Sequence, residues 1–217
     1  DEDVGDRANA SVRIDGSNLR CRVVVEGGNL GLTQAGRIEY ARNGGKINTD
    51  FIDNSGGVNC SDREVNLKIL LRQSESKNLI SNQEGRMKLQ AAVSEVVEKI
   101  LEDNYEQAQR ISLEVATSPG RLDSYEDLMG GLERNGMLDR AIEGLPSAEE
   151  MMERSRRSVG LERPELAVLM AYAKGDIARS LLATDFAESE GSADYLLTYF
   201  PSTVTVEFGS VMAEHPL

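Results

Sequence analysis

The chain has 217 residues, of which 40% are apolar and 28% are charged, a balance typical of folded globular proteins and unlike that of disordered ones. This length corresponds to one or two domains of about 150 residues each. The formal net charge of -13 argues against nucleic acids and anionic membranes as partners, because their phosphates would repel the chain.

The sequence also disfavours several kinds of site and compartment. No apolar run approaches the roughly 18 residues that cross a bilayer, and the chain opens with three acidic residues instead of a signal peptide. Two cysteines, Cys21 and Cys60, are too few for a disulfide framework or a structural zinc site, which favours a cytoplasmic location. The only histidine, His215, lies two residues from the end of the sequence, so neither a histidine-based catalytic triad nor a multi-histidine metal site is expected unless other chains supply it.

The first sixty residues indicate short strands around one helix. Extended segments are expected at 11–14, 19–25 and 46–52, and the apolar run from Val23 to Val25 is typical of a strand buried on both faces of a parallel sheet. A helix is expected over 33–43, with Thr33 as its N-cap. The order strand, loop, helix, strand indicates a fragment of an α/β layer.

Beyond residue 60 the apolar residues recur every three or four positions, which predicts helices almost throughout. Ser61 and Glu64 fit a capping box that would open a helix over 62–73. Further helices are expected at 84–114, at 122–132, from Pro164 to about 182 and at 204–211. We therefore predict a mainly α protein with a small α/β N-terminal part, divided into residues 1–72 and residues 73–217.

Two loops rich in glycine and amide side chains are the candidate binding sites. In the first, Gly27, Gly28 and Asn29 follow the apolar strand, at the sheet edge where α/β proteins bind ligands. Glycine lets the backbone approach a ligand, and Asn29 offers both a donor and an acceptor. The second loop runs from 53 to Ser61, where a helix N-terminus would favour a carboxylate. Both loops can equally be structural, with Ser61 acting only as a cap.

These two stretches resemble signature motifs of the glutamate dehydrogenases. Residues 23–29, followed by Thr33, resemble the motif E-G-A-N-x-P-T-T, and residues 54–61, followed by Glu64, resemble N-A-G-G-V-x-x-S-x-x-E. The order and separation of the motifs also agree. Their form here is similar to the very large bacterial NAD-dependent glutamate dehydrogenases, and residues 163–169 resemble a segment of the helical C-terminal region of those enzymes.

The resemblance implies that residues 1–72 are the truncated end of a Rossmann-like NAD-binding domain and that residues 73–217 are a helical C-terminal domain. It implies the oxidation of L-glutamate by NAD to 2-oxoglutarate and ammonium. Gly27, Gly28, Asn29 and Asn54 would contact the cofactor, and Ser61 and Asn54 would bind the substrate. The other expected partner is the remainder of the parent chain, in an enzyme that is expected to be a homo-oligomer.

The reactive groups of such an enzyme are not found in this sequence. No two of its twenty glycines have the G-x-G spacing of a dinucleotide fingerprint, and no lysine matches the family's catalytic lysine. We therefore expect a C-terminal fragment that is inactive alone. Two alternatives stay open: a helical assembly or regulatory module of the parent enzyme, and a related amino-acid dehydrogenase. Convergence of Asn29, Asn54 and Ser61 on one cleft would favour the enzymatic site.

Overall fold

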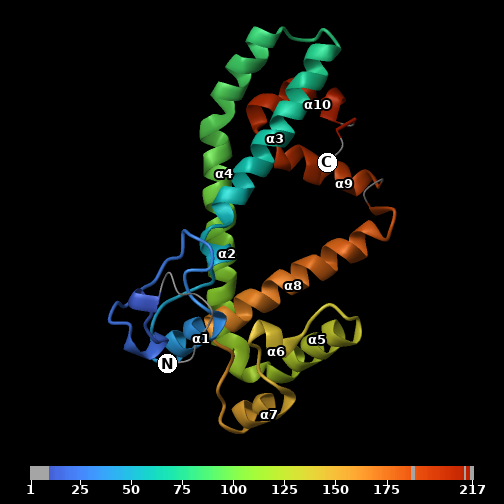
Figure 1. The fold of residues 1–217 in the computed structure, drawn as a ribbon. Helices are drawn as coiled ribbons and strands as arrows, with labels where there is room; N and C mark the ends of the chain where they lie inside the picture. The colour runs from blue at the N-terminus through green and yellow to red at the C-terminus, as the bar shows by residue number, and fades with distance from the viewer. Residues whose placement is uncertain (1–9, 187–188, 213, 216–217) are drawn as a thin grey trace. The chain divides into compact units, whose positions relative to one another are not determined.

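The computed structural model describes residues 10–186, 189–212 and 214–215, and in these ranges it is built mainly of helices (Figure 1). The mainly α character predicted from the sequence is confirmed. The chain folds into two compact units, one formed by Asp1–Asp53 with Gln109–Tyr172 and the other by Asn54–Ala108 with Ala173–Leu217. The expected domain boundary at residue 72 differs from this division and stays a prediction.

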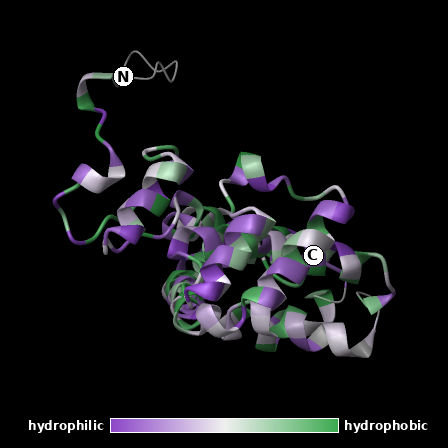
Figure 2. Ribbon diagram, turned by 90° about the horizontal axis from the view of Figure 1, so that it is seen from below, coloured by the Kyte–Doolittle hydropathy of each residue, from purple (hydrophilic) through white to green (hydrophobic). Residues whose placement is uncertain are grey.

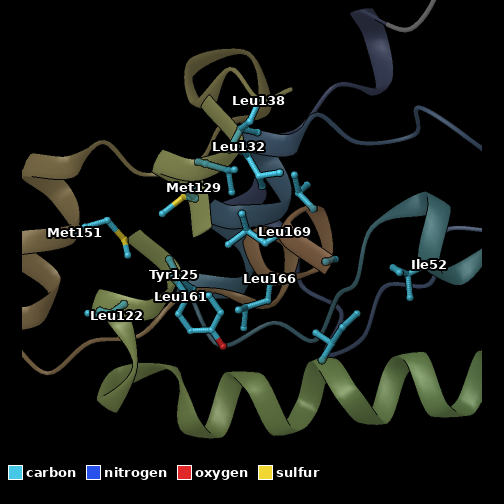
Figure 3. Packing of buried hydrophobic residues seen from close by; sticks show 14 residues of the cluster. Ile52, Leu122, Tyr125, Met129, Leu132, Leu138, Met151, Leu161, Leu166 and Leu169 are labelled. Carbon is cyan, nitrogen blue, oxygen red and sulfur yellow. The ribbon is translucent and has the colours of Figure 1, made fainter. Parts of the chain in front are cut away.

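The first unit packs short helices around one apolar core. Tyr125, Met129 and Leu132 of one helix meet Leu166 and Leu169 of another, as Figure 3 shows. Met129 is completely buried. The elements of this unit are η1 (Ala10–Val12), η2 (Gly16–Asn18), α1 (Gln34–Arg42), α2 (Asp50–Asp53), the end of α4 (Asn82–Thr117), η3 (Ser118–Gly120), α5 (Leu122–Arg134), α6 (Arg140–Glu143), α7 (Ala148–Arg156) and the start of α8 (Arg163–Leu182).

Helix α1 begins and ends where the sequence predicts. The Thr33 hydroxyl accepts a hydrogen bond from the Gly36 amide at 3.1 Å, which is the N-cap contact. Gly44 ends the helix with a φ of 87°, a left-handed conformation that glycine adopts without strain. Pro164, as predicted, lies in the first turn of α8.

The strand predictions are mostly wrong. Residues 11–14 form part of a 3-10 turn and irregular chain, and in the described residues the β pairing is one isolated parallel bridge between Val23 and Lys46. Val23 is 59% exposed and Val25 73% exposed, so this segment is not buried on both faces. A single neighbouring segment cannot cover the apolar side chains of a strand. The Rossmann-like N-terminal part of the prediction is therefore not shown.

The second unit is a helical hairpin with C-terminal helices packed on it. Its elements are α3 (Ser55–Ser76), the first part of α4, the end of α8, α9 (Glu190–Tyr199) and α10 (Ser202–Met212). Helices α3 and α4 run antiparallel (Figure 1), and Leu67 and Leu70 of α3 pack against Phe200, Val204 and Phe208. Figure 2 shows hydrophilic and hydrophobic residues interleaved along the ribbons, as amphipathic helices require.

Candidate functional site

The glycine-rich loop that follows Val25 is held at both ends by carboxylates of α2. The Glu26 amide donates to Asp53 Oδ2 at 2.9 Å, and the Leu30 amide donates to Asp50 Oδ2, also at 2.9 Å. Between these anchors, Gly27, Gly28 and Asn29 are exposed. The loop therefore presents two glycines and an amide side chain to solvent from a backbone that is fixed on either side.

A buried arginine of α1 joins the side chains of Glu26 and Asp50. Arg37 donates to both carboxylate oxygens of Glu26, through Nε at 2.7 Å and Nη2 at 2.9 Å. Its Nη2 also lies 3.4 Å from Asp50 Oδ1. The side chains of Arg37 and Glu26 are only 8% and 3% exposed, so this ion pair is almost completely removed from water. No pattern in the sequence pointed to this network.

The opposite charges of this network stabilise the ionised forms of Asp50 and Arg37. Burial alone would raise the pKa of Asp50, but hydrogen bonds from the Leu30 and Phe51 amides and the charge of Arg37 outweigh it and lower the pKa. Burial would likewise lower the pKa of Arg37, and the hydrogen bond and charge of Glu26 raise it instead. Both groups are therefore ionised at neutral pH and hold the loop by charged hydrogen bonds.

The anchor at Asp53 is itself positioned by a hydrogen-bonded chain within the first unit. The Asn48 amide donates to Asp53 Oδ1 at 2.6 Å, and Arg163 of α8 donates to Asn48 Oδ1. A second nitrogen of Arg163 donates to Ser112 Oγ at 2.8 Å. Arg163 belongs to the segment 163–169 singled out in the sequence, and here it connects the start of α8 to α2.

The second candidate loop is helical, which corrects the expected cap. Helix α3 begins at Ser55 with Asn54 as its N-cap residue, so Ser61 lies inside the helix and does not open it. The exposed Ser61 hydroxyl donates to the carbonyl oxygen of Gly57 at 3.3 Å. The backbone amides expected to be free after Ser61 are used within the helix, and an anion there would depend on the Ser61 side chain.

Packing on α4 explains why this glycine-containing segment is helical. Ser55 Oγ accepts hydrogen bonds from the side chains of Asn104 at 2.8 Å and Gln107 at 3.3 Å. Asn59 donates to Asp103 Oδ2 at 2.7 Å. Two glycines inside a helix cost about 2 kcal/mol relative to alanine, and such contacts with a neighbouring helix offset that cost.

A second ionic cluster, also missed from the sequence, holds this part of α3. Arg63 donates to Asp103 Oδ2 at 2.8 Å and to Asn59 Oδ1 at 3.0 Å, and its guanidinium lies 4.9 Å from the centre of the Tyr199 ring. Burial opposes ionisation of Asp103, but the hydrogen bonds from Arg63 and Asn59 prevail and lower its pKa. The cluster binds α3 to α4 and leaves Ser61 on the exposed side.

The predicted site residues thus form two groups. Gly27, Gly28 and Asn29 share one exposed loop of the first unit, whereas in the second unit Asn54 is the N-cap residue of α3 and Ser61 lies within that helix. Each group is well defined by itself. Convergence of the two groups on one cleft stays a prediction.

Comparison with known protein families decides what these two groups belong to. Residues 1–114, which contain both, match the family described as bacterial NAD-glutamate dehydrogenase, catalytic domain. The chain belongs to this family. Residues 158–217 match a second model, glutamate dehydrogenase, C-terminal. The family resemblance seen in the sequence is confirmed.

Individual members of this family are similar in sequence to this chain over all or nearly all of its length. The NAD-specific glutamate dehydrogenase of Halomonas elongata is 44% identical over 217 residues, which cover 100% of this chain and 14% of the relative. The Pseudomonas aeruginosa protein of the same name is 44% identical over 99% of this chain and 13% of its own length. The Mycobacterium tuberculosis protein of the same name is 38% identical over 100% of this chain and 13% of its own length. The chain spans only about one-seventh of these relatives.

None of the helices in the described ranges is long and apolar enough to cross a membrane.

Proposed function

We propose that this chain is part of an NAD-dependent glutamate dehydrogenase, which converts L-glutamate, NAD and water into 2-oxoglutarate, ammonium and NADH. The observation that supports this most directly is the match of residues 1–114, including both candidate motifs, to the catalytic domain of that family. The relatives named above are each called an NAD-specific glutamate dehydrogenase, which favours glutamate as the substrate and NAD as the cofactor.

In this proposal the chain supplies binding contacts and the rest of the parent enzyme supplies the reactive groups. Gly27 and Gly28 allow the backbone to approach the cofactor, and the Asn29 amide contacts the nicotinamide end of NAD or the substrate. Asn54 lines the same cleft. The Ser61 hydroxyl turns from Gly57 to donate to a substrate carboxylate. The isolated chain, which has no match to the family's catalytic lysine, does not turn over glutamate.

Substitutions in the full-length parent enzyme test the roles of Asn29 and Ser61. Because Ser61 is inside α3 and caps nothing, Ser61→Ala leaves the helix intact. It should lower kcat/KM for glutamate about ten- to a hundredfold, the effect of losing a hydrogen bond to a charged group. Asn29→Ala should lower kcat/KM up to about tenfold. NADH formation from glutamate is the assay.

Each substitution has a matched control in the same chain. Ser76 is exposed on α3 and donates to a carbonyl oxygen of its own helix, Gln73, just as Ser61 does, and Asn43 is an exposed amide at the end of α1. Ser76→Ala and Asn43→Ala should retain wild-type kinetics. If the substitutions at Ser61 and Asn29 are equally silent in an active enzyme, the binding role is wrong.

A second function, assembly of the parent enzyme, is favoured by one face of α4. Four apolar side chains at i, i+4 spacing are between 46% and 65% exposed: Val93, Val97, Leu101 and Tyr105. Glu98, Glu102 and Glu106 form a row beside them. A second copy would bring like charges together, so this face fits a helix of the parent chain that carries lysine or arginine beside an apolar stripe.

A further inference from the structure

We infer that Arg37 is a positioning residue, which fixes the loop formed by Gly27, Gly28 and Asn29 in the geometry that the cofactor and substrate require. This inference rests on the proposed function of that loop. No match to the family assigns a role to Arg37, and its hydrogen bonds to Glu26 and Gln34 lie outside the three loop residues. Its effect would act entirely through the two carboxylates that it joins.

Arg37 connects the two ends of the loop. Arg37 binds Glu26, the residue directly before the loop, by two hydrogen bonds of 2.7 and 2.9 Å. The same guanidinium lies 3.4 Å from Asp50, whose other oxygen accepts the amide of Leu30, the residue directly after the loop. One planar group therefore sets the separation of the two ends of the loop.

The two glycines contribute no anchor of their own to the loop. Glycines carry no side chain that could anchor them, and a Cβ placed on Gly27 or Gly28 would meet no atom within 4 Å. Leu30 is 89% exposed and adopts a φ of 64°, which is unfavourable for leucine. Because glycine loses more conformational entropy on ordering than other residues, holding the two ends of the loop favours one conformation of it.

Among the basic side chains, only arginine can bind Glu26 and Asp50 in this way. A guanidinium offers several donors in a rigid plane and can bind both oxygens of Glu26 while facing Asp50, whereas a lysine offers one charged point. Without Arg37, the carboxylates of Glu26 and Asp50, with side chains 3% and 11% exposed, would remain buried without their shared cation. The ends of the loop would then move apart.

A second arginine in the same unit provides a matched control. Arg154 binds both oxygens of Glu165 at 2.7 Å, and those two side chains are 12% and 1% exposed. The Arg154 pair is comparable in geometry and burial, and Arg154 donates its hydrogen bonds to Glu165 and Gly160, which lie outside the loop. Arg37→Met and Arg154→Met should therefore cost similar stability and differ in what they do to the loop.

Hydrogen exchange in the 217-residue chain measures the loop directly. Arg37→Met should speed exchange of the Glu26 and Leu30 amides at least tenfold relative to amides of α5, and Arg154→Met should not. Arg37→Lys should give an intermediate increase and keeps the test available if the methionine variant does not fold. Equal exchange at Glu26 and Leu30 in the Arg37 and Arg154 variants would overturn the inference.

Kinetics of the full-length enzyme measure the consequence. A displacement of about 1 Å in a positioned group can cost up to a hundredfold in rate, so Arg37→Lys should lower kcat/KM for NAD and glutamate by about ten- to a hundredfold. Arg154→Lys should stay within about twofold of wild type at a temperature where both are folded. Equal kinetic losses would show that Arg37 is merely structural. A wild-type enzyme that does not reduce NAD with glutamate would refute the proposed function instead, and the exchange experiment would still decide the role of Arg37.

Discussion

The buried pair of Arg154 and Glu165 gives the sharpest prediction about stability. Arg154→Met removes two hydrogen bonds of 2.7 Å from a carboxylate whose side chain is 1% exposed. The carboxylate keeps the Glu162 amide at 2.6 Å and a more distant guanidinium, that of Arg42, at 3.7 Å. Removing one partner of a buried pair costs about 3–5 kcal/mol, and these residual contacts place the expected loss near 3 kcal/mol.

A double-mutant cycle separates this loss from ordinary packing. In Arg154→Met combined with Glu165→Gln no buried charge is left without a partner, so the double variant should be more stable than the sum of the two single effects by about 1–3 kcal/mol. Urea denaturation of the 217-residue chain, followed by circular dichroism, provides the free energies of unfolding. The exposed pair Arg156 and Glu153, with side chains 71% and 54% exposed, is the control, and Arg156→Met should change stability by less than about 0.5 kcal/mol.

Two results would refute the reasoning. A loss below about 1 kcal/mol in Arg154→Met would mean that Glu165 is not held as a buried charge by Arg154. Additive effects in the double variant would mean that the two side chains do not depend on each other.

Three further predictions concern the loop, α4 and the response to acid. Gly27→Ala and Gly28→Ala should leave the urea midpoint of the isolated chain unchanged, since a Cβ at either position meets nothing within 4 Å, and should lower the activity of the full-length enzyme; full activity would remove the reason for glycine there. Leu101→Asp should be neutral in the isolated chain, where Leu101 is 65% exposed, and should lower the melting temperature of the full-length enzyme; equal shifts in both would refute the assembly face. The lowered pKa of Asp50 means that its stabilising contribution is complete above the ordinary aspartate value of 3.8 and is lost as the pH falls through the folded value. Asp50→Asn should therefore flatten the fall of the urea midpoint below about pH 4, and an unchanged profile would contradict the network.

The helices with strong local signals could be predicted from the sequence. Thr33 supplies an N-cap contact and Gly44 a left-handed stop, so the limits of α1 follow from the identities of neighbouring residues. Pro164 and the apolar repeat after it likewise indicate α8. These features depend on contacts over three or four positions, which the sequence shows directly.

The start of α3 could not be predicted in the same way. Gly56 and Gly57 favour a turn by local preference, and the helix there depends on Asn104 and Asp103 of another helix, which lie more than forty positions away. The expected cap at Ser61 was wrong for that reason. The strand predicted at Val23 is wrong for a related reason, because a strand depends on neighbouring strands that its own residues do not specify.

The candidate site likewise has one part that could be predicted from the sequence and one part that could not. The exposed loop of Gly27, Gly28 and Asn29 follows from the sequence, because glycine and asparagine favour loops. The anchoring network does not, because Arg37 and Asp50 lie 11 and 24 positions from Glu26 and no periodic pattern links the three. Buried ion pairs of this kind become visible only when the fold brings the charges together.

The most direct measurement is a density map of the full-length enzyme with NAD and 2-oxoglutarate bound. Our account predicts the side-chain amide of Asn29 within about 3 Å of the nicotinamide or the substrate, and the Ser61 hydroxyl within about 3 Å of a substrate carboxylate, in the same pocket. A map in which both ligands are bound elsewhere, with Asn29 and Ser61 facing separate surfaces, would contradict it.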